Sequence, residues 1–179
     1  MAVTYYTSLA EALPVVNAVV QKAVEIEQQS VQGQVVFRDI VPADFGLSSW
    51  LLAPGGGAST VTIVANYQIP SKVTIGIFGF AVDTFGQPMS VEYVDLFVGG
   101  SRVRRWSLSP AQANKQSGVM YLSAEESIIL TDNSQITMVA VVNNPTGSGF
   151  LKLAVLGVVA EPLGRTIILP TSTTPARTQ

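Results

Sequence analysis

The feature that most constrains the fold of this chain is a series of short runs in which apolar and polar residues alternate. Residues 59–67 read STVTIVANY and divide between two faces, with Val61, Ile63 and Ala65 on one and Thr60, Thr62 and Asn66 on the other. A two-residue period is that of a β-strand, whose side chains point alternately to the two sides of a sheet. Comparable runs occupy residues 72–82, 90–98, 102–108, 135–143 and 149–160. The sequence therefore predicts strands over most of its length.

Turn-forming residues separate these runs. Glycine, proline, asparagine and aspartate gather at residues 55–57, 85–88, 99–100, 131–133 and 143–147. These residue types favour tight reversals of the chain. Many short strands joined by turns, with no helices between them, are typical of antiparallel sheets packed in two layers. We therefore expect residues 34–169 to form an all-β domain, an antiparallel β-sandwich of the jelly-roll kind.

A different pattern occupies residues 1–33, where we expect a helical extension. Ser8 and Glu11 have the spacing of a capping box. However, Pro14 would clash with the carbonyl of Ala10 in a continuous helix, so the main helix is predicted to begin at Pro14 and to stop near Gly33. Its stripe of residues at helical spacing comprises Val16, Val20, Ala23 and Glu27. The many valines leave a pair of β-branched strands as the alternative.

Both ends of the chain lie outside the alternating region. Residues 170–179 are small, polar and proline-containing, which is typical of a flexible tail or of an arm that becomes ordered on a partner. We expect the N-terminal extension and this tail to bind neighbouring subunits. For the helix, packing on its own sheet is the equal alternative.

Two of the runs are apolar on both faces, although a sheet of a two-layer fold normally meets water on one side. Their second faces carry large apolar residues, Phe78 and Phe80 in residues 72–82, and Leu156 and Val158 in residues 149–160. Contiguous exposed apolar surface usually marks an interaction site. The N-terminal helix could cover one such face but is too short to cover two sheets. These four residues are therefore candidate interface residues, with burial within the chain as the alternative.

The segment VGGSRVRRW holds the other candidate interface residues, Arg102, Arg104, Arg105 and Trp106. A loop of residues 99–101 would set Asp95 opposite Arg105 across a hairpin, and a loop of residues 99–100 would set it opposite Arg104. Three hypotheses follow: a cross-strand ion pair with solvated arginines, an interface with a neighbouring subunit, or an anion site. Arginine is enriched at protein interfaces.

Composition excludes several kinds of function. The chain has no cysteine and no histidine, so thiolate nucleophiles, Ser-His-Asp triads and imidazole metal sites are impossible. Ten basic against twelve acidic residues give a net charge of -2, which disfavours nucleic acid as a partner. No segment is apolar enough to span a bilayer, and residues 1–13 lack the pattern of a secretory signal. We expect no cofactor, no metal ion and no catalytic residue.

Weaker candidates for chemistry remain. Glu125 and Glu126 are adjacent, so on a strand they point to opposite faces and cannot act as a glycosidase carboxylate pair. Residues 132–134 could offer oxygen atoms to calcium but lack the spacing of a calcium loop, so a turn is expected. Four aromatic residues could stack on sugar rings if they lined one surface: Trp50, Tyr67, Trp106 and Tyr121.

The succession of strand segments, including IPSKVTIGIFGFAV, VEYVDLFVGGSRVRRWSLSP and LAVLGVVAEPLGRTIILP, resembles small β-sandwich virion proteins of bacteriophages. These are capsid cement or decoration proteins and small single-jelly-roll capsid proteins. The likeness covers the chain from Gln34 onward. It implies a non-enzymatic structural protein of the virion, made in the host cytoplasm, that binds itself and a major capsid protein. The alternatives are a carbohydrate-binding module and a glycosidase-like enzyme.

Overall fold

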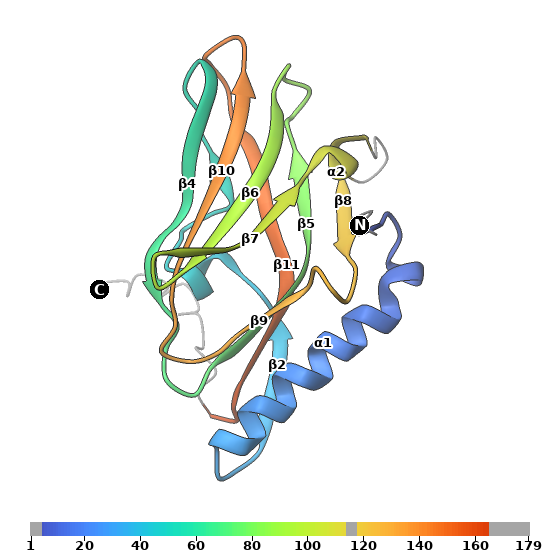
Figure 1. Cartoon of the computed structure of the whole chain (residues 1–179), viewed down its shortest axis with the longest axis vertical. Helices are drawn as coiled ribbons and strands as arrows, with labels where there is room; N and C mark the ends of the chain where they lie inside the picture. The colour runs from blue at the N-terminus through green and yellow to red at the C-terminus, as the bar shows by residue number, and fades with distance from the viewer. Residues whose placement is uncertain (1–4, 114–117, 165–179) are drawn as a thin grey trace, which may run out of the picture.

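The computed structural model describes residues 5–113 and 118–164. In these residues two antiparallel sheets are present, and one long helix packs on the first of them (Figure 1). The first sheet has the order β1-β8-β5-β11-β2, with β9 paired to β5 and β3 paired to β11. The second has the order β4-β10-β6-β7. Every strand pair is antiparallel.

The strands of the first sheet are distributed along the whole described chain. They are β1 (Tyr5–Tyr6), β2 (Val35–Asp39), β3 (Leu51–Leu52), β5 (Thr74–Asp83), β8 (Val119–Leu122), β9 (Ile128–Leu130) and β11 (Leu151–Pro162). The second sheet is formed by β4 (Gly57–Gln68), β6 (Ser90–Val98), β7 (Ser101–Ser107) and β10 (Gln135–Asn144). The helices are α1 (Leu9–Ser30), the 3-10 turn η1 (Pro42–Phe45) and α2 (Ser109–Ala113).

One hydrophobic core lies between the two sheets. It includes Ile75 and Phe80 from the first sheet and Val94 and Met138 from the second. The prediction of antiparallel sheets with an N-terminal helix is therefore confirmed, and the strand bounds agree with the alternating runs to within two residues after Ser90. The predicted tail, residues 170–179, lies outside the described residues.

The helix begins earlier than the sequence predicted. It starts at Leu9, with Ser8 as its cap: the Ser8 Oγ accepts a hydrogen bond from the Glu11 amide at 3.4 Å. Pro14 lies inside the helix and is exposed. The predicted start at Pro14 is wrong because a proline in the second turn removes only one helical hydrogen bond, and the neighbouring turns retain theirs.

The helix also buries a different stripe. Its buried residues are Ala12, Val15, Val19, Ala23 and Glu27, whereas Val16 and Val20 are only partly covered. This stripe lies on the outer face of the first sheet, where Val158 and Ala160 of β11 join it in a second apolar cluster. A Cβ atom on Gly76 of β5 would lie 2.5 Å from the Val19 Cγ1. The absence of a side chain at Gly76 therefore allows the close approach of the helix.

The helix covers both strands that are apolar on two faces. β5 and β11 are neighbours in one sheet, so a single helix contacts both. The prediction that the helix is too short was wrong because it assumed that the two strands belong to different sheets. Of the two alternatives for the helix, the described chain shows packing on its own sheet.

Candidate interaction surface

The arginine cluster lies on the β6–β7 hairpin. Its turn is the two-residue Gly99–Gly100 loop, with φ values of 57° and 82°, as a type I′ turn requires. A turn of this length would by itself set Asp95 opposite Arg104. A register shift skips Val103, however, so that Asp95 pairs with Arg105. A two-residue loop thus gives the pairing that we expected of a three-residue loop, because a β-bulge inserts one extra residue.

Asp95 and Arg105 form a bidentate ion pair across the hairpin. The Arg105 Nε and Nη2 donate to the two carboxylate oxygens of Asp95, each at 2.7 Å. The guanidinium also lies over the ring of Tyr93, at 3.8 Å from its centroid. The hydrogen bonds from Arg105 hold the pKa of Asp95 below its ordinary value, helped by the charges of Arg105 and Arg102 and opposed by burial. The carboxylate therefore stays ionised under all but strongly acid conditions.

Replacing Asp95 by asparagine is expected to lower the thermal midpoint at pH 7 by no more than a few degrees, because Arg105 is open to water. A carboxyl group whose pKa is lower in the folded state stabilises that state above its unfolded pKa, and this contribution is lost as the pH falls through the folded pKa. The difference between the wild type and Asp95→Asn should therefore shrink below about pH 4. Thermal unfolding from pH 2 to 7 measures it, and a difference that does not change with pH contradicts this assignment.

The other two arginines also have carboxylates of their own chain nearby. The Arg102 Nη1 lies 3.8 Å from the Asp95 Oδ2, and the Arg104 Nη1 lies 3.9 Å from the Glu126 Oε2. These contacts favour the ion-pair hypothesis for the cluster. Arg102 keeps a side chain that is 51% exposed, and its role in an interface stays a prediction.

Trp106 and Phe80 lie in the core. Their ring centroids are 5.1 Å apart, and the Trp106 Nε1 donates to the carbonyl of Glu126 at 3.0 Å. They were predicted as interface residues, but the second sheet covers Phe80 and both side chains are buried in the described chain. The sequence placed Phe78 and Phe80 on one face of β5, but a register shift against β11 skips Phe78. Phe80 therefore faces the core, whereas Phe78 packs against the cluster beneath α1.

The remaining candidates lie on the first sheet. Val158 is buried in the cluster beneath α1, and Phe78 is partly buried against the same cluster. Leu156 is partly buried. α1 therefore covers Val158 and Phe78, so their burial needs no partner protein. A role of Leu156 in an interface stays a prediction.

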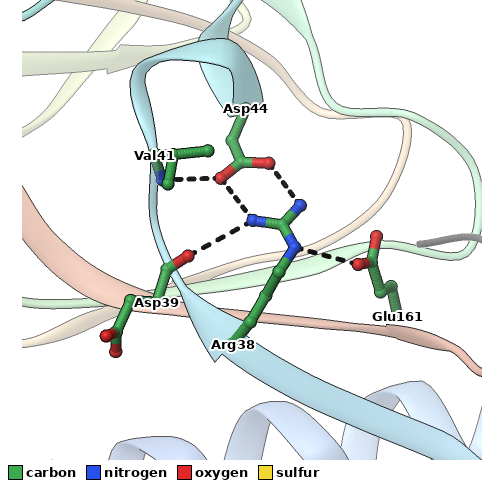
Figure 2. Close-up of polar contacts among 5 residues, drawn as sticks. All are labelled: Arg38, Asp39, Val41, Asp44 and Glu161. Carbon is green, nitrogen blue, oxygen red and sulfur yellow. Dashed lines mark hydrogen bonds and ion pairs between the residues drawn. The ribbon is translucent and has the colours of Figure 1, made fainter. Parts of the chain in front are cut away.

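Sequence reasoning missed a partly buried ion network at the end of β2, shown in Figure 2. The carboxylates of Asp44 and Glu161 are largely buried, and the side chain of Arg38 is 30% exposed. The Arg38 Nη2 and Nη1 donate to the Asp44 carboxylate at 2.6 and 2.8 Å, and its Nε donates to the Glu161 Oε1 at 3.0 Å. The Nη1 also donates to the carbonyl of Asp39 at 3.2 Å, and the Val41 amide donates to the Asp44 Oδ2 at 2.8 Å. These bonds fasten η1 and β2 to β11.

Arg38 remains charged in this network. The hydrogen bonds to Asp44 raise its pKa above the ordinary value, joined by the charge of Asp44 and by Glu161 and opposed by burial. A guanidinium that cannot lose its proton does not act as an acid or a base, and the hydrogen bonds of Arg38 connect β2 to η1 and β11. Glu161 is 123 residues away from Arg38 in the sequence, and no local spacing could have predicted the pair.

Replacing Arg38 by methionine is expected to cost about 3 kcal/mol of stability, because it leaves the carboxylates of Asp44 and Glu161 buried without a cation. Urea unfolding measures the loss. Arg102→Met is the matched control, since that arginine is half exposed, and it should cost less than about 1 kcal/mol. Equal losses from the two variants would show that the network contributes no more than a surface ion pair.

The structure exposes two groups of apolar side chains that the sequence pattern did not predict. The tip group consists of Leu51, Phe85 and Phe150. Its members lie at one end of the molecule, since Leu51 and Asp83 both pair with Lys152 of β11. The edge group consists of Phe37, Val41 and Leu163 and borders β2, because the Leu163 amide donates to the carbonyl of Gln34.

An apolar cleft of about 180 Å³ opens between β7 and β8. Tyr5, Trp106, Met120 and Leu122 line it, and its charged lining residues are Arg105 and Glu126. Both already take part in ion pairs. The cleft thus offers one carboxylate, whereas glycoside hydrolysis generally needs two on opposite sides of the bond.

The weaker candidates are also placed by the structure. Glu125 and Glu126 lie in a turn, and Asp132 and Asn133 lie in another. Trp50 and Tyr67 pack edge-to-face on the buried Phe45, with centroids 6.0 and 6.2 Å from it. They therefore do not form one flat surface with the buried Trp106, as sugar stacking would require.

No family model matches the chain, and no curated protein matches it either. Within residues 5–113 and 118–164, no group of three or more acidic residues is placed to hold a metal ion. No helix in the same residues combines the length and hydropathy needed to cross a bilayer.

Proposed function

We propose that the chain is a non-enzymatic structural subunit of a virus particle, built on a jelly roll. The observation that carries the proposal is the nesting of the strand pairs. Counting β8 and β9 as one interrupted strand, and leaving out the two-residue strands β1 and β3, eight strands remain. The first pairs with the eighth, the second with the seventh, the third with the sixth and the fourth with the fifth.

This nesting describes one long antiparallel hairpin folded over on itself. Its four pairs alternate between the sheets: β2 with β11 and β5 with β8 in the first, β4 with β10 and β6 with β7 in the second. Such winding supports the jelly-roll proposal, and jelly rolls are common in viral capsid and lectin domains. The lectin role is disfavoured, because Trp106 is buried and Trp50 and Tyr67 pack on the buried Phe45.

The surface supports a role in assembly. Only 12% of residues are charged, about half the usual fraction. The tip group and the edge group gather six large exposed apolar side chains in two places, and clustered apolar surface usually marks an interaction site. A second copy and another virion subunit are the partners that we propose for these surfaces. The subunit would act in the particle, after synthesis in the host cytoplasm.

Sedimentation velocity and negative-stain electron microscopy of the purified chain test this proposal. At tens of micromolar we expect oligomers, and under assembly conditions ordered rings or shells. The variant Phe150→Ser, in the exposed tip group, should fold as stably as the wild type while forming fewer of the larger assemblies. A chain that remains a monodisperse monomer under all these conditions contradicts a role in self-assembly.

A further inference from the structure

The open edge of β2 has backbone groups that lack a partner in the described chain. β2 is the last strand of the first sheet. The amide of Ile40 donates to Gly157, and Gln34 accepts from Leu163, so the even-numbered residues direct their backbone groups toward β11. Because alternate residues of an antiparallel strand face opposite sides, those of Val35 and Phe37 face outward.

The edge is well suited to pairing with another strand. The register of β2 with β11 is regular over all five residues, whereas β7 and β4, the edges of the second sheet, both contain register shifts. Bulges are a common way in which proteins protect an edge. Phe37 is 60% exposed and Leu163 is 59% exposed, so apolar surface lies beside the unpaired backbone groups.

The chain itself provides a suitable strand. After Gly164 it continues with residues 165–179, which lie outside the described part, and residues 166–169 read TIIL. Two adjacent isoleucines favour a strand. Pro170 follows and would end it, since proline cannot donate a backbone hydrogen bond.

The direction of the chain decides which copy provides this strand. β11 runs antiparallel to β2 and ends beside its first residue, where Pro162 pairs with Val35. A segment that turned back there along the open edge would run parallel to β2. The same segment from a copy related by a two-fold axis starts at the opposite end and runs antiparallel, which is the more stable pairing.

We propose that residues 166–169 of a second copy add to the open edge of β2 as an antiparallel strand, in a reciprocal exchange between two subunits. The exchange places apolar side chains of the arriving strand beside Phe37 and satisfies the outward groups of Val35 and Phe37. This inference rests on the proposed function, for which it names the partner and the contact.

Cysteine cross-linking tests the exchange, because the natural chain contains no cysteine. A chain with Phe37→Cys is mixed with chains that carry Ile167→Cys, Ile168→Cys or Leu169→Cys, and the mixture is oxidised gently. We expect a disulfide between the two different chains for at least one of these positions. Phe85→Cys in the tip group, which is 53% exposed, is the matched control and should not link to any of them.

If something other than residues 166–169 of a second copy pairs with the edge of β2, the disulfide products differ. Dimers only between two Phe37→Cys chains indicate direct pairing of two β2 edges and overturn the proposal. A further chain carries both Phe37→Cys and one of the three cysteines at residues 167–169. If its disulfide forms only within the chain, the chain's own segment covers the edge of β2, and the proposal is overturned as well. No link to Phe37→Cys at any position has the same consequence.

Truncation gives a second measurement. A chain that ends at Gly164 should dimerise with a dissociation constant at least about tenfold higher than that of the full chain, whereas a chain that ends at Pro170 should dimerise normally. If the shorter chain dimerises normally while the full chain still forms shells, the strand exchange is wrong and the proposed function stands. If the exchange is found but the chain is absent from virus particles, the proposed function is wrong.

Discussion

Replacing Gly157 by alanine is expected to cost about 3 kcal/mol or more, enough to unfold a marginally stable domain. A Cβ atom at this position would overlap the carbonyl oxygen of Gly76 on β5 and the Cδ1 atom of Ile40. The carbonyl belongs to the backbone of the neighbouring strand, so it cannot move away without disturbing the pairing of β5 with β11. Urea unfolding followed by circular dichroism measures the loss.

Gly55→Ala is the matched control for this substitution. A Cβ atom there meets nothing within 4 Å, and its φ angle does not require glycine, so stability should change by less than about 0.5 kcal/mol. If Gly157→Ala proves as stable as Gly55→Ala, β5 and β11 do not lie as close together at Gly157 as the structure shows.

Removing residues 1–32 is expected to give a chain that aggregates or unfolds, because α1 covers the outer face of the first sheet. The deletion exposes Val158, Ala160 and Phe78 to water. It also removes Glu27, whose buried carboxylate accepts a hydrogen bond from the Thr74 Oγ1 at 3.0 Å. Solubility and cooperative thermal unfolding of the shortened chain measure the effect.

A point substitution separates the packing of α1 from the loss of the whole segment. Val19→Asp places a charge in the buried cluster and should cost about 3 kcal/mol, since a buried charge without a partner is strongly unfavourable. Asn17→Asp lies on the exposed face of the same helix and should change stability by less than about 0.5 kcal/mol. A shortened chain that unfolds at the wild-type temperature would instead assign residues 1–32 to an arm.

The alternation of residues predicted most of the strands, because it depends only on the two-residue period of the β-strand. It did not predict the bulges that change which side chains are buried. Ala65 was expected on the same face as Ile63, which is buried, but Ala65 is exposed and Val64 is buried instead. The register shifts between Ile136 and Val139 and the φ of 45° at Asn66 mark the irregularity in this pair of strands.

The candidate surface was harder to predict than the strands. Whether Phe80 and Val158 meet a core, a helix or a partner depends on which strands are neighbours, and this is set by contacts between residues far apart in the sequence. The network of Arg38 with Asp44 and Glu161 has the same origin. The pairing of Asp95 with an arginine was predictable, because a hairpin brings together residues that are close in sequence.

The central claim is that this chain is a structural component of a virus particle. Quantitative mass spectrometry of particles purified by density gradient, from the biological source of the sequence, tests it most directly. The account predicts the chain in intact particles at a copy number comparable with that of the major shell protein, and its retention after washing with salt. Absence of the chain from intact particles, while it is abundant in the soluble fraction of the same infected cells, would contradict the account.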